Sequence, residues 1–375
     1  MKPVIIGCRT LDFTLEQLTV LADQKPFGMI IFLEVCEKGS DTIRHVIKQF
    51  RDAVGWDAPV FADNEGGLVN RFKPTFNHGW AEIPGHRAIG NVYLKDKDAG
   101  KELALLVGQL IADQMIELGV NVNCAPVVDR VAEELVKPSS DGKQHATSSS
   151  FFNRTFSDDI ETIVTLAKEY MNGLESRGVV PVVKHVPGYG RVSKDPHYSL
   201  PIVTASHEEL SATDFEIFKR LNNAKSMMTG HLIYTDIDDK RSATISPKVI
   251  DEVVRKEIGF KGLLIPDTIE MAGIAPELFD NERQQLFGLP WPKPGAMGQI
   301  TKWCIGAGCD VVLHSDLSRD FAHTIEILEA TDHVSPEKEA QMKADFGLID
   351  RAQLGEFDRA ACAEKVKTIL EKYKD

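Results

Sequence analysis

Short apolar segments alternate with amphipathic segments along most of this 375-residue sequence, and this alternation restricts the possible folds more than any other feature. Eight apolar segments, rich in Val, Ile and Leu, are typical of strands buried on both faces of a parallel sheet. They cover residues 4–7, 28–33, 59–62, 120–124, 179–183, 226–229, 262–265 and 310–313. The amphipathic segments have apolar residues at helical spacing. They cover residues 14–24, 41–54, 101–118, 158–177, 207–223, 247–258, 300–306 and 317–330.

Eight strands alternating with helices predict an α/β protein, a (β/α)8 TIM barrel with a single catalytic domain over residues 1–332. In such a barrel, the active site lies at the C-terminal ends of the strands. An open, doubly wound sheet is the alternative, but it usually has a Gly-rich dinucleotide-binding turn after the first strand, and residues 7–10 are not such a turn. Residues 333–375 are highly charged and predict a C-terminal helical extension packed on the barrel.

The composition argues against several classes of partner. The chain has 43 Lys and Arg against 56 Asp and Glu, a formal net charge of −13, which disfavours nucleic acid or an anionic membrane as the main partner. No apolar run reaches membrane-spanning length, and the apolar run at the start is too short for a signal peptide. The six cysteines are scattered, without a metal-binding spacing. We therefore expect a cytoplasmic monomer with no disulfide, metal or cofactor.

The most informative loop follows the strand predicted at residues 179–183. Lys184 and His185 stand where that strand would end, and a loop rich in Pro and Gly comes next. This loop carries Asp195 and His197. A carboxylate beside an imidazole holds its tautomer and stabilises the imidazolium, which prepares a histidine for proton transfer. On spacing alone, both residues could equally be solvated loop residues.

Charged residues also follow other predicted strands, at positions that a barrel would bring to its mouth. Together with Lys184 and His185, these residues are Asp63, Arg154, His231 and Asp267. Alone, Asp267 could simply cap the next helix. Charged groups that converge at a rim are costly unless they are paired or used, so the whole set predicts a functional site.

Six motifs occur in a fixed order between residues 63 and 271. They are Asp63-x-Glu65-Gly66-Gly67-x-Val69-x-Arg71, Gly-Val-Asn-Val-Asn-Cys-Ala-Pro-Val-Val-Asp over residues 119–129, Asn153-Arg154-Thr155-Phe156, Lys184-His185-x-Pro187-Gly188-x-Gly190-(x)4-Asp195-x-His197, Gly230-His231 with Ile237-Asp238, and Asp267-x-Ile269-x-Met271. In this order, they resemble the motifs of glycoside hydrolase family 3 β-N-acetylhexosaminidases of the NagZ type. The resemblance covers roughly residues 3–330.

The resemblance implies a retaining exo-β-N-acetylglucosaminidase, acting on terminal β-linked N-acetylglucosamine of cell-wall muropeptides or chito-oligosaccharides, as in peptidoglycan recycling. Asp267 aligns with the nucleophile, His197 with the acid/base and Asp195 with the partner of that histidine. The residues expected to hold the sugar are Asp63, Arg71, Arg154, Lys184, His185 and His231. These residue types suit the chemistry, because a carboxylate can form a glycosyl-enzyme while an acid protonates the departing oxygen and later activates water.

Four sites depart from the family's pattern. Tyr189 stands where the family usually has a second His, and Pro196 stands where it has Ser. Thr268 replaces an acidic residue that often follows the nucleophile, and Glu-Val at residues 34–35 replaces Arg-Asn. Pro196 fixes its own φ and restricts the residue before it. The departures therefore bear on the orientation of the loop and on substrate preference.

Residues 287–295 look like an insertion after the predicted nucleophile strand, on the catalytic face of the barrel. Three prolines limit the conformations of this segment. Trp291 lies between two of them, so it is a candidate stacking surface for the leaving-group side of the substrate. The alternative is that Trp291 packs against the barrel wall and anchors the segment there.

Other functions stay open at this point. A Schiff-base lyase would use Lys184 as its nucleophile, but it would leave Asp195, His197 and Asp267 without roles. A barrel could also bind a sugar or muropeptide without turning it over. Within the same family, a phosphorylase would use phosphate in place of water, and phosphate-dependent formation of a sugar 1-phosphate would distinguish it from a hydrolase.

Overall fold

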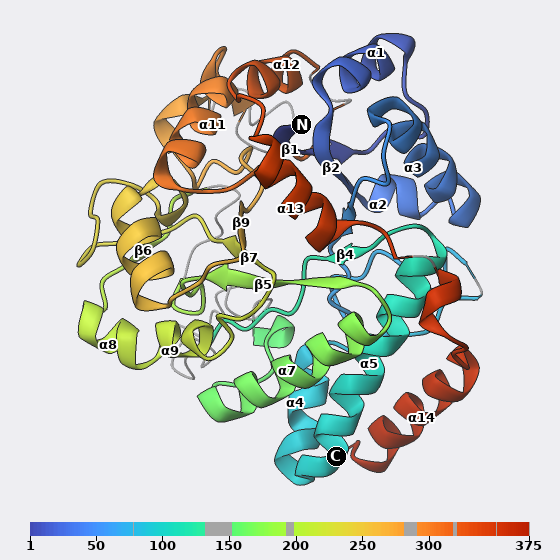
Figure 1. Ribbon diagram of the computed structural model, residues 1–375. Helices are drawn as coiled ribbons and strands as arrows, with labels where there is room; N and C mark the ends of the chain where they lie inside the picture. The colour runs from blue at the N-terminus through green and yellow to red at the C-terminus, as the bar shows by residue number, and fades with distance from the viewer. Residues whose placement is uncertain are drawn as a thin grey trace.

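Eight parallel strands form the centre of the molecule in the computed structural model, which describes residues 1–77, 79–131, 152–192, 199–280, 291–317, 321–349 and 351–374 (Figure 1). Their order in the sheet is β12-β1-β2-β3-β4-β5-β7-β9. Their bounds are β1 (Lys2–Cys8), β2 (Pro26–Ile31), β3 (Val60–Ala62), β4 (Val122–Asn123), β5 (Val180–Val186), β7 (Ser226–Thr229), β9 (Leu263–Pro266) and β12 (Val312–Leu313). Asp310 N donates to Leu264 O (2.9 Å) and Ile269 N to Leu313 O (3.1 Å), which join the two end strands. The predicted (β/α)8 barrel is confirmed.

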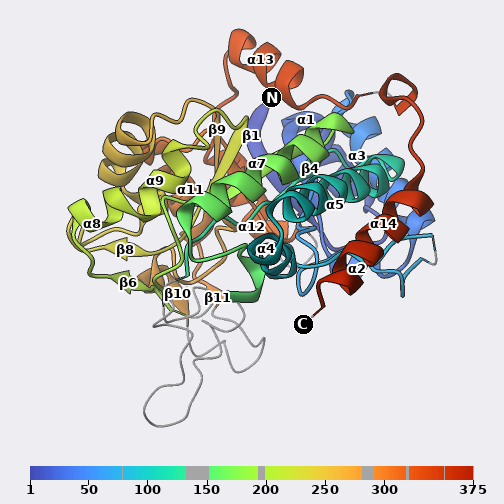
Figure 2. The same cartoon turned by 90° about the horizontal axis from the view of Figure 1, so that it is seen from below.

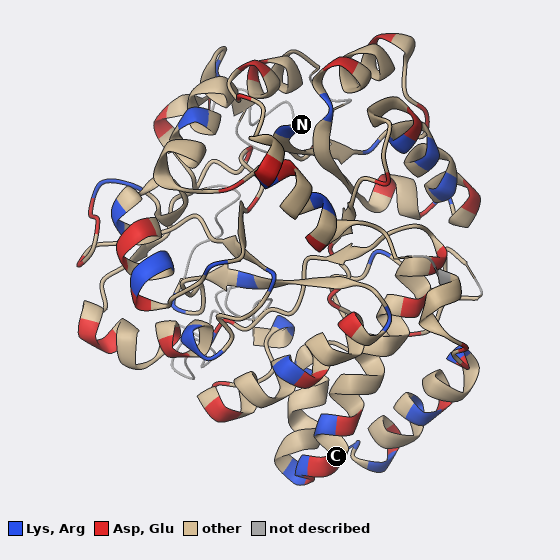
Figure 3. Cartoon of the chain, in the orientation of Figure 1, with Lys and Arg blue, Asp and Glu red and all other residues tan. Residues whose placement is uncertain are grey.

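Helices surround this barrel, and most of them match the amphipathic segments of the sequence (Figures 1 and 2). They are α1 (Leu15–Gln24), α2 (Leu33–Cys36), α3 (Ser40–Val54), α4 (His86–Lys95), α5 (Lys97–Glu117), α7 (Ile160–Ser176), α8 (His207–Ala212), α9 (Asp214–Lys219), the π-helix η3 (Lys248–Glu257), α11 (Ala296–Ala307) and α12 (Phe321–Glu329). The single helix expected at residues 207–223 is two helices, α8 and α9. Along these helices, Lys and Arg lie among Asp and Glu (Figure 3).

The sequence pattern gave no sign of α4. This helix contains Gly90, where a Cβ atom would lie 1.8 Å from Phe156 O, so α4 packs backbone against backbone at that point. Only a glycine permits such a close approach. Helix propensity disfavours an interior glycine, so here tertiary packing prevailed over local preference.

Strand alternation carries two expected site residues to the barrel mouth. In β5, Val180 and Val182 pack inside the barrel, and Lys184 lies two residues further on the same face. In β9, Ile265 packs inside, and Asp267 follows two residues later. Because successive side chains on a strand point to opposite faces, residues at i and i+2 share a face. Both charged side chains therefore continue the interior rows of the barrel.

The C-terminal extension is helical, as expected, and it also closes the barrel. Helix α13 (Pro336–Phe346) crosses the end at which the strands begin (Figures 1 and 2), and its Met342 and Phe346 belong to the interior core of the barrel. The Phe346 ring meets that of Phe27 edge to face, with centroids 5.6 Å apart. Helix α14 (Arg359–Lys372) packs on α5.

Two small ribbons lie at the opposite end from α13 (Figure 2). One pairs β6 (Ile202–Val203) with β8 (Ile233–Tyr234), and the other pairs β10 (Phe279–Asp280) with β11 (Trp291–Pro292). This is the end at which the barrel strands finish, where βα loops build active sites. Among the described residues, no helix has the length and apolar character needed to cross a membrane.

Candidate active site

A network of opposite charges links the tips of β3 and β5. Lys184 Nζ lies 3.0 Å from Asp63 Oδ1 and 2.8 Å from Glu65 Oε1. Arg154 contacts Glu65 through both Nε and Nη2, each at 2.8 Å, which is the bidentate geometry of a strong charge-assisted pair. Arg71 Nη2 lies 3.5 Å from Asp63 Oδ2. The structure therefore brings together four of the expected sugar-binding residues and adds Glu65.

The charge states of this network follow from its geometry. Burial would raise the pKa of Asp63, but the cations of Lys184 and Arg71 outweigh it and hold that pKa below its usual value. Burial likewise would lower the pKa of Lys184, yet the carboxylates of Asp63 and Glu65 raise it well above the usual range. Lys184 therefore remains an ammonium group. A Schiff-base lyase needs a free amine, so this environment does not suit that alternative.

His185 and Asp267 face each other across the mouth. His185 Nε2 lies 3.9 Å from Asp267 Oδ2, and His185 Nδ1 lies 2.7 Å from Asp129 Oδ2. The Asp267 side chain is 24% exposed, whereas those of His185 and Asp129 are 5% and 0% exposed. Asp267 is thus the carboxylate of this group that a ligand can reach.

Backbone contacts fix the position of Asp267. Asp267 N donates to Thr229 O (3.1 Å), and Thr268 N donates to Asp267 Oδ1 (2.7 Å). Residues 269–274 then form turns and bends, and the next helical element is the short 3₁₀ helix Pro276–Leu278. No helix begins directly after Asp267, so this residue is not a helix cap.

His231 lies beneath the site. The residue is 0% exposed; its Nδ1 is 2.9 Å from Thr244 Oγ1, and its Nε2 donates to Thr268 O (3.1 Å). The neighbouring Gly230 leaves room for the Tyr189 ring, which a Cβ atom would meet at 2.3 Å. His231 thus contacts the backbone of the residue next to Asp267, instead of standing at the rim as the sequence suggested.

Two further expectations concern the loops. Asp195, Pro196 and His197 lie outside the described residues, so the structure does not report on the expected acid/base pair. Trp291 is described: it is half-buried in β11, opposite Asp280, with its ring centroid 5.7 Å from that of His323 in α12. It stands at the same end of the barrel as the strand tips (Figure 2).

Three buried polar residues that the sequence analysis did not single out support this site: Glu65, Asp129 and His86. Glu65 and Asp129 stand inside the family-like motifs, which could have indicated them. His86 begins the unexpected helix α4; its Nδ1 donates to Arg154 O (2.7 Å), and its ring lies 4.3 Å from that of Phe156. His86 therefore holds the backbone of Arg154 in position through this hydrogen bond.

His86 should make stability depend on pH. Burial lowers its pKa from the ordinary 6.5 to about 4, so between these values the unfolded chain binds a proton that the folded chain does not. Stability therefore falls as the pH drops from 6.5 towards 4, and at pH 5 the loss from this residue is on the order of 2 kcal/mol. We expect His86→Gln to reduce the difference between urea unfolding free energies at pH 7 and pH 5. An equal difference in both proteins would contradict this role.

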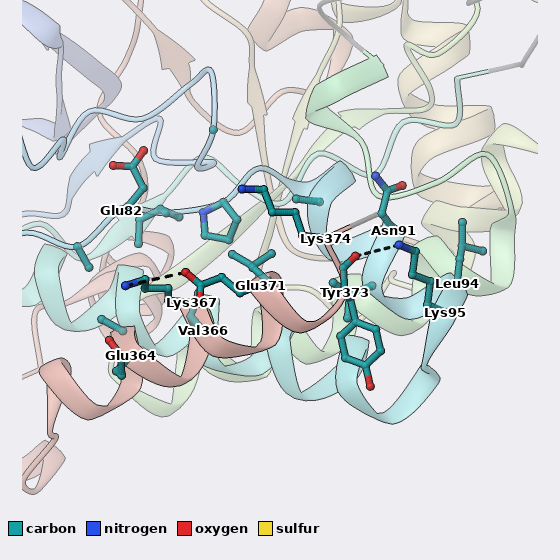
Figure 4. Close-up of a pocket in the computed structure, with 18 of the residues that line it drawn as sticks. Glu82, Asn91, Leu94, Lys95, Glu364, Val366, Lys367, Glu371, Tyr373 and Lys374 are labelled. Carbon is teal, nitrogen blue, oxygen red and sulfur yellow. Dashed lines mark hydrogen bonds and ion pairs between the residues drawn. The ribbon is translucent and has the colours of Figure 1, made fainter.

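A separate groove of about 1190 Å³ lies on the outer wall, between α4 and α14 (Figure 4). Val92 of α4 and Val366 and Leu370 of α14 contribute apolar side chains to it, while Glu82 and Lys367 lie among its polar lining residues. None of the expected site residues lines this groove. The charged mouth of the barrel, not this groove, is therefore the candidate active site.

Residues 11–334 match the glycosyl hydrolase family 3 N terminal domain. The chain therefore belongs to glycosyl hydrolase family 3 and is a glycosidase.

Several relatives of the chain are beta-hexosaminidases. The Beta-hexosaminidase of Psychromonas ingrahamii is 29% identical over 276 residues, which are 73% of this chain and 75% of that protein. The Beta-hexosaminidase of Xylella fastidiosa strain M23 is 27% identical over 360 residues, 94% of this chain and 92% of that protein. NagZ from Neisseria gonorrhoeae, solved in complex with N-trifluoroacetyl-D-glucosamine, has the same fold: the TM-score is 0.79 at 22% identity, over 98% of this chain and 97% of that chain.

Proposed function

We propose that this protein is a retaining exo-β-N-acetylglucosaminidase that hydrolyses terminal β-linked N-acetylglucosamine from cell-wall muropeptides or chito-oligosaccharides in the cytoplasm. The observation that carries the proposal is Asp267, an accessible carboxylate at the tip of β9, facing His185 at 3.9 Å beside the network of Lys184 and Asp63. The names of its relatives, and the N-acetylglucosamine analogue bound to one of the similar structures, support the choice of sugar.

In this proposal, the network binds the terminal sugar. Asp63 is held ionised, so its oxygens accept hydrogen bonds from sugar hydroxyls. Lys184, Arg71 and Arg154 can only donate, and their cations balance the carboxylates, so a neutral sugar meets both donors and acceptors. His231 contributes by holding the backbone beside the nucleophile, as its contact with Thr268 O suggests.

The proposed reaction has two steps. Asp267 attacks the anomeric carbon and forms a glycosyl ester, while His197, paired with Asp195, gives its proton to the leaving oxygen as the glycosidic bond breaks. His197 then takes a proton from water, which attacks the same carbon and releases the sugar and the Asp267 carboxylate. The assignments of His197 and Asp195 rest on the sequence resemblance.

The function is tested by release of p-nitrophenol from the β-N-acetylglucosaminide and from the β-glucoside, each with and without phosphate. We expect turnover of the first, little of the second, and no dependence on phosphate. Phosphate-dependent formation of a sugar 1-phosphate would indicate a phosphorylase instead. Binding of the sugar without turnover would indicate a non-catalytic barrel.

Trp291 should affect long substrates more than short ones. It is half-buried at the catalytic end of the barrel, so the exposed part of its indole is available to stack on the leaving-group side of a substrate. We expect Trp291→Ala to raise KM several-fold for a disaccharide or muropeptide and to change KM little for a small aryl glycoside. Trp303→Ala, at a half-buried tryptophan of α11, is the matched control. Equal changes on both substrates would favour a structural role in contact with His323.

A further inference from the structure

Asp129 is a buried carboxylate that the structure places beside His185. β4 ends at Asn123, but the chain continues along β5: Lys184 N donates to Pro126 O (3.1 Å), and Val128 N donates to Lys184 O (2.9 Å). This pairing carries Asp129 to the position next to His185, although the two residues are 56 apart in the sequence.

Among the described residues, the hydrogen bonds of Asp129 go to residues 185 and 189. Its Oδ2 lies 2.7 Å from His185 Nδ1, and its Oδ1 accepts from Tyr189 N (2.6 Å). Both oxygens also lie within 3.3 Å of His185 N, which donates to them. One carboxylate thus holds the imidazole ring and both ends of the turn that follows it.

The surroundings leave this arrangement little freedom. Gly188 N donates to His185 O (2.8 Å), which closes the turn. At Gly190, a Cβ atom would lie 1.7 Å from Arg130 O, so the chain after the turn packs directly on the residue after Asp129. With the Asp129 side chain 0% exposed, water does not compete for its oxygens.

These contacts fix the direction of the ring. An ionised carboxylate only accepts hydrogen bonds, so His185 Nδ1 must carry a proton and Nε2 must point away from Asp129. In that direction, Nε2 lies 3.9 Å from Asp267 Oδ2. We propose that Asp129 is a positioning residue of the reaction: it acts through His185, by holding Nε2 towards the nucleophile and the sugar bound against it. This inference rests on the proposed function of Asp267.

Asp129→Asn tests the inference with little change in volume. The amide NH₂ cannot accept from His185 Nδ1–H, so the Nδ1-protonated ring loses the contact that holds it, while the amide oxygen can still accept from Tyr189 N. A misplacement of about 1 Å near the reacting atoms costs on the order of 10²-fold in rate. We therefore expect kcat/KM on the aryl N-acetylglucosaminide to fall about 10²-fold.

A double-mutant cycle separates positioning from general stability. If Asp129 acts through His185, adding Asp129→Asn to His185→Ala should cause no further loss of kcat/KM, because the ring it holds is already gone. Asp113→Asn is the matched control, since Asp113 is also buried but pairs with Arg177 and Arg359 away from the site. Its effect should be additive with that of His185→Ala. Additive losses for Asp129→Asn as well would overturn the inference.

Two measurements on the wild-type protein apply even if the variant does not fold. Imidazole ¹⁵N shifts should show His185 Nδ1 protonated, and hydrogen exchange should show the Tyr189 amide as protected as the amides of β5. An unprotonated His185 Nδ1, or rapid hydrogen exchange at the Tyr189 amide, would refute the inference. Neither readout depends on turnover, so a failure of the proposed function would be recognised separately, as a wild-type protein that cleaves none of the test glycosides.

Discussion

Replacing Asp267 with Asn is expected to lower kcat by on the order of 10⁴-fold or more, because the variant lacks the carboxylate that would form the glycosyl-enzyme. The fold should be retained. The side chain is 24% exposed, and the hydrogen bond that it accepts from Thr268 N can also be accepted by the amide oxygen of Asn. Steady-state kinetics on an activated aryl N-acetylglucosaminide, with a thermal melt of the same sample, measures both expectations.

The matched control is Asp316→Asn. Asp316 also follows a barrel strand, β12, and its side chain is 12% exposed beside Arg9. Asp316→Asn removes one negative charge from the same end of the barrel and keeps the Asp267 carboxylate, so its effect on kcat should stay below about tenfold. A fluorinated N-acetylglucosaminide that accumulates the ester should label Asp267 in the wild-type protein and leave the Asp267→Asn protein unlabelled. Wild-type turnover by the variant would show that Asp267 is not the nucleophile.

Replacing His197 with Ala is expected to separate substrates by their leaving groups. A sugar or muramyl oxygen needs a proton to depart, so its cleavage should slow by about 10²- to 10⁴-fold, the usual contribution of general acid–base catalysis. An aryl oxide of low pKa departs without help, so formation of the glycosyl-enzyme should slow little on that substrate. Comparing kcat/KM for a disaccharide and for a dinitrophenyl glycoside measures the difference.

His197 should also affect the second half of the reaction. Without a base to activate water, the glycosyl-enzyme should persist on the activated substrate and give a burst of dinitrophenol followed by slow turnover. Azide needs no base, so adding it should restore turnover and yield a glycosyl azide. Equal losses on both substrates, with no burst, would mean that His197 positions substrate and does not transfer a proton.

The sequence predicted the barrel strands well because their signal is local. A buried parallel strand is a short run of Val, Ile and Leu, and all eight expected segments overlap a strand of the barrel. Helix α4 was missed, and the structure uses its glycine at residue 90 for a close backbone contact with Phe156. The helical extension was expected, but the insertion of Phe346 into the barrel interior was not.

The amino-acid sequence by itself determined the strand order, the family and the residue types at the strand tips. The alternation of apolar and amphipathic segments and the motifs both depend on residues that are close together in the sequence. Only the tertiary structure decided which tips meet. Lys184 contacts Asp63 and Glu65 across more than a hundred residues, and the contact with Thr268 O places His231 in the interior beside Asp267 and not at the rim. The physical reason is that ion pairs and ring orientations depend on strand register and barrel closure. These bring together residues that are far apart in the sequence, and no local sequence pattern indicates which of them will meet.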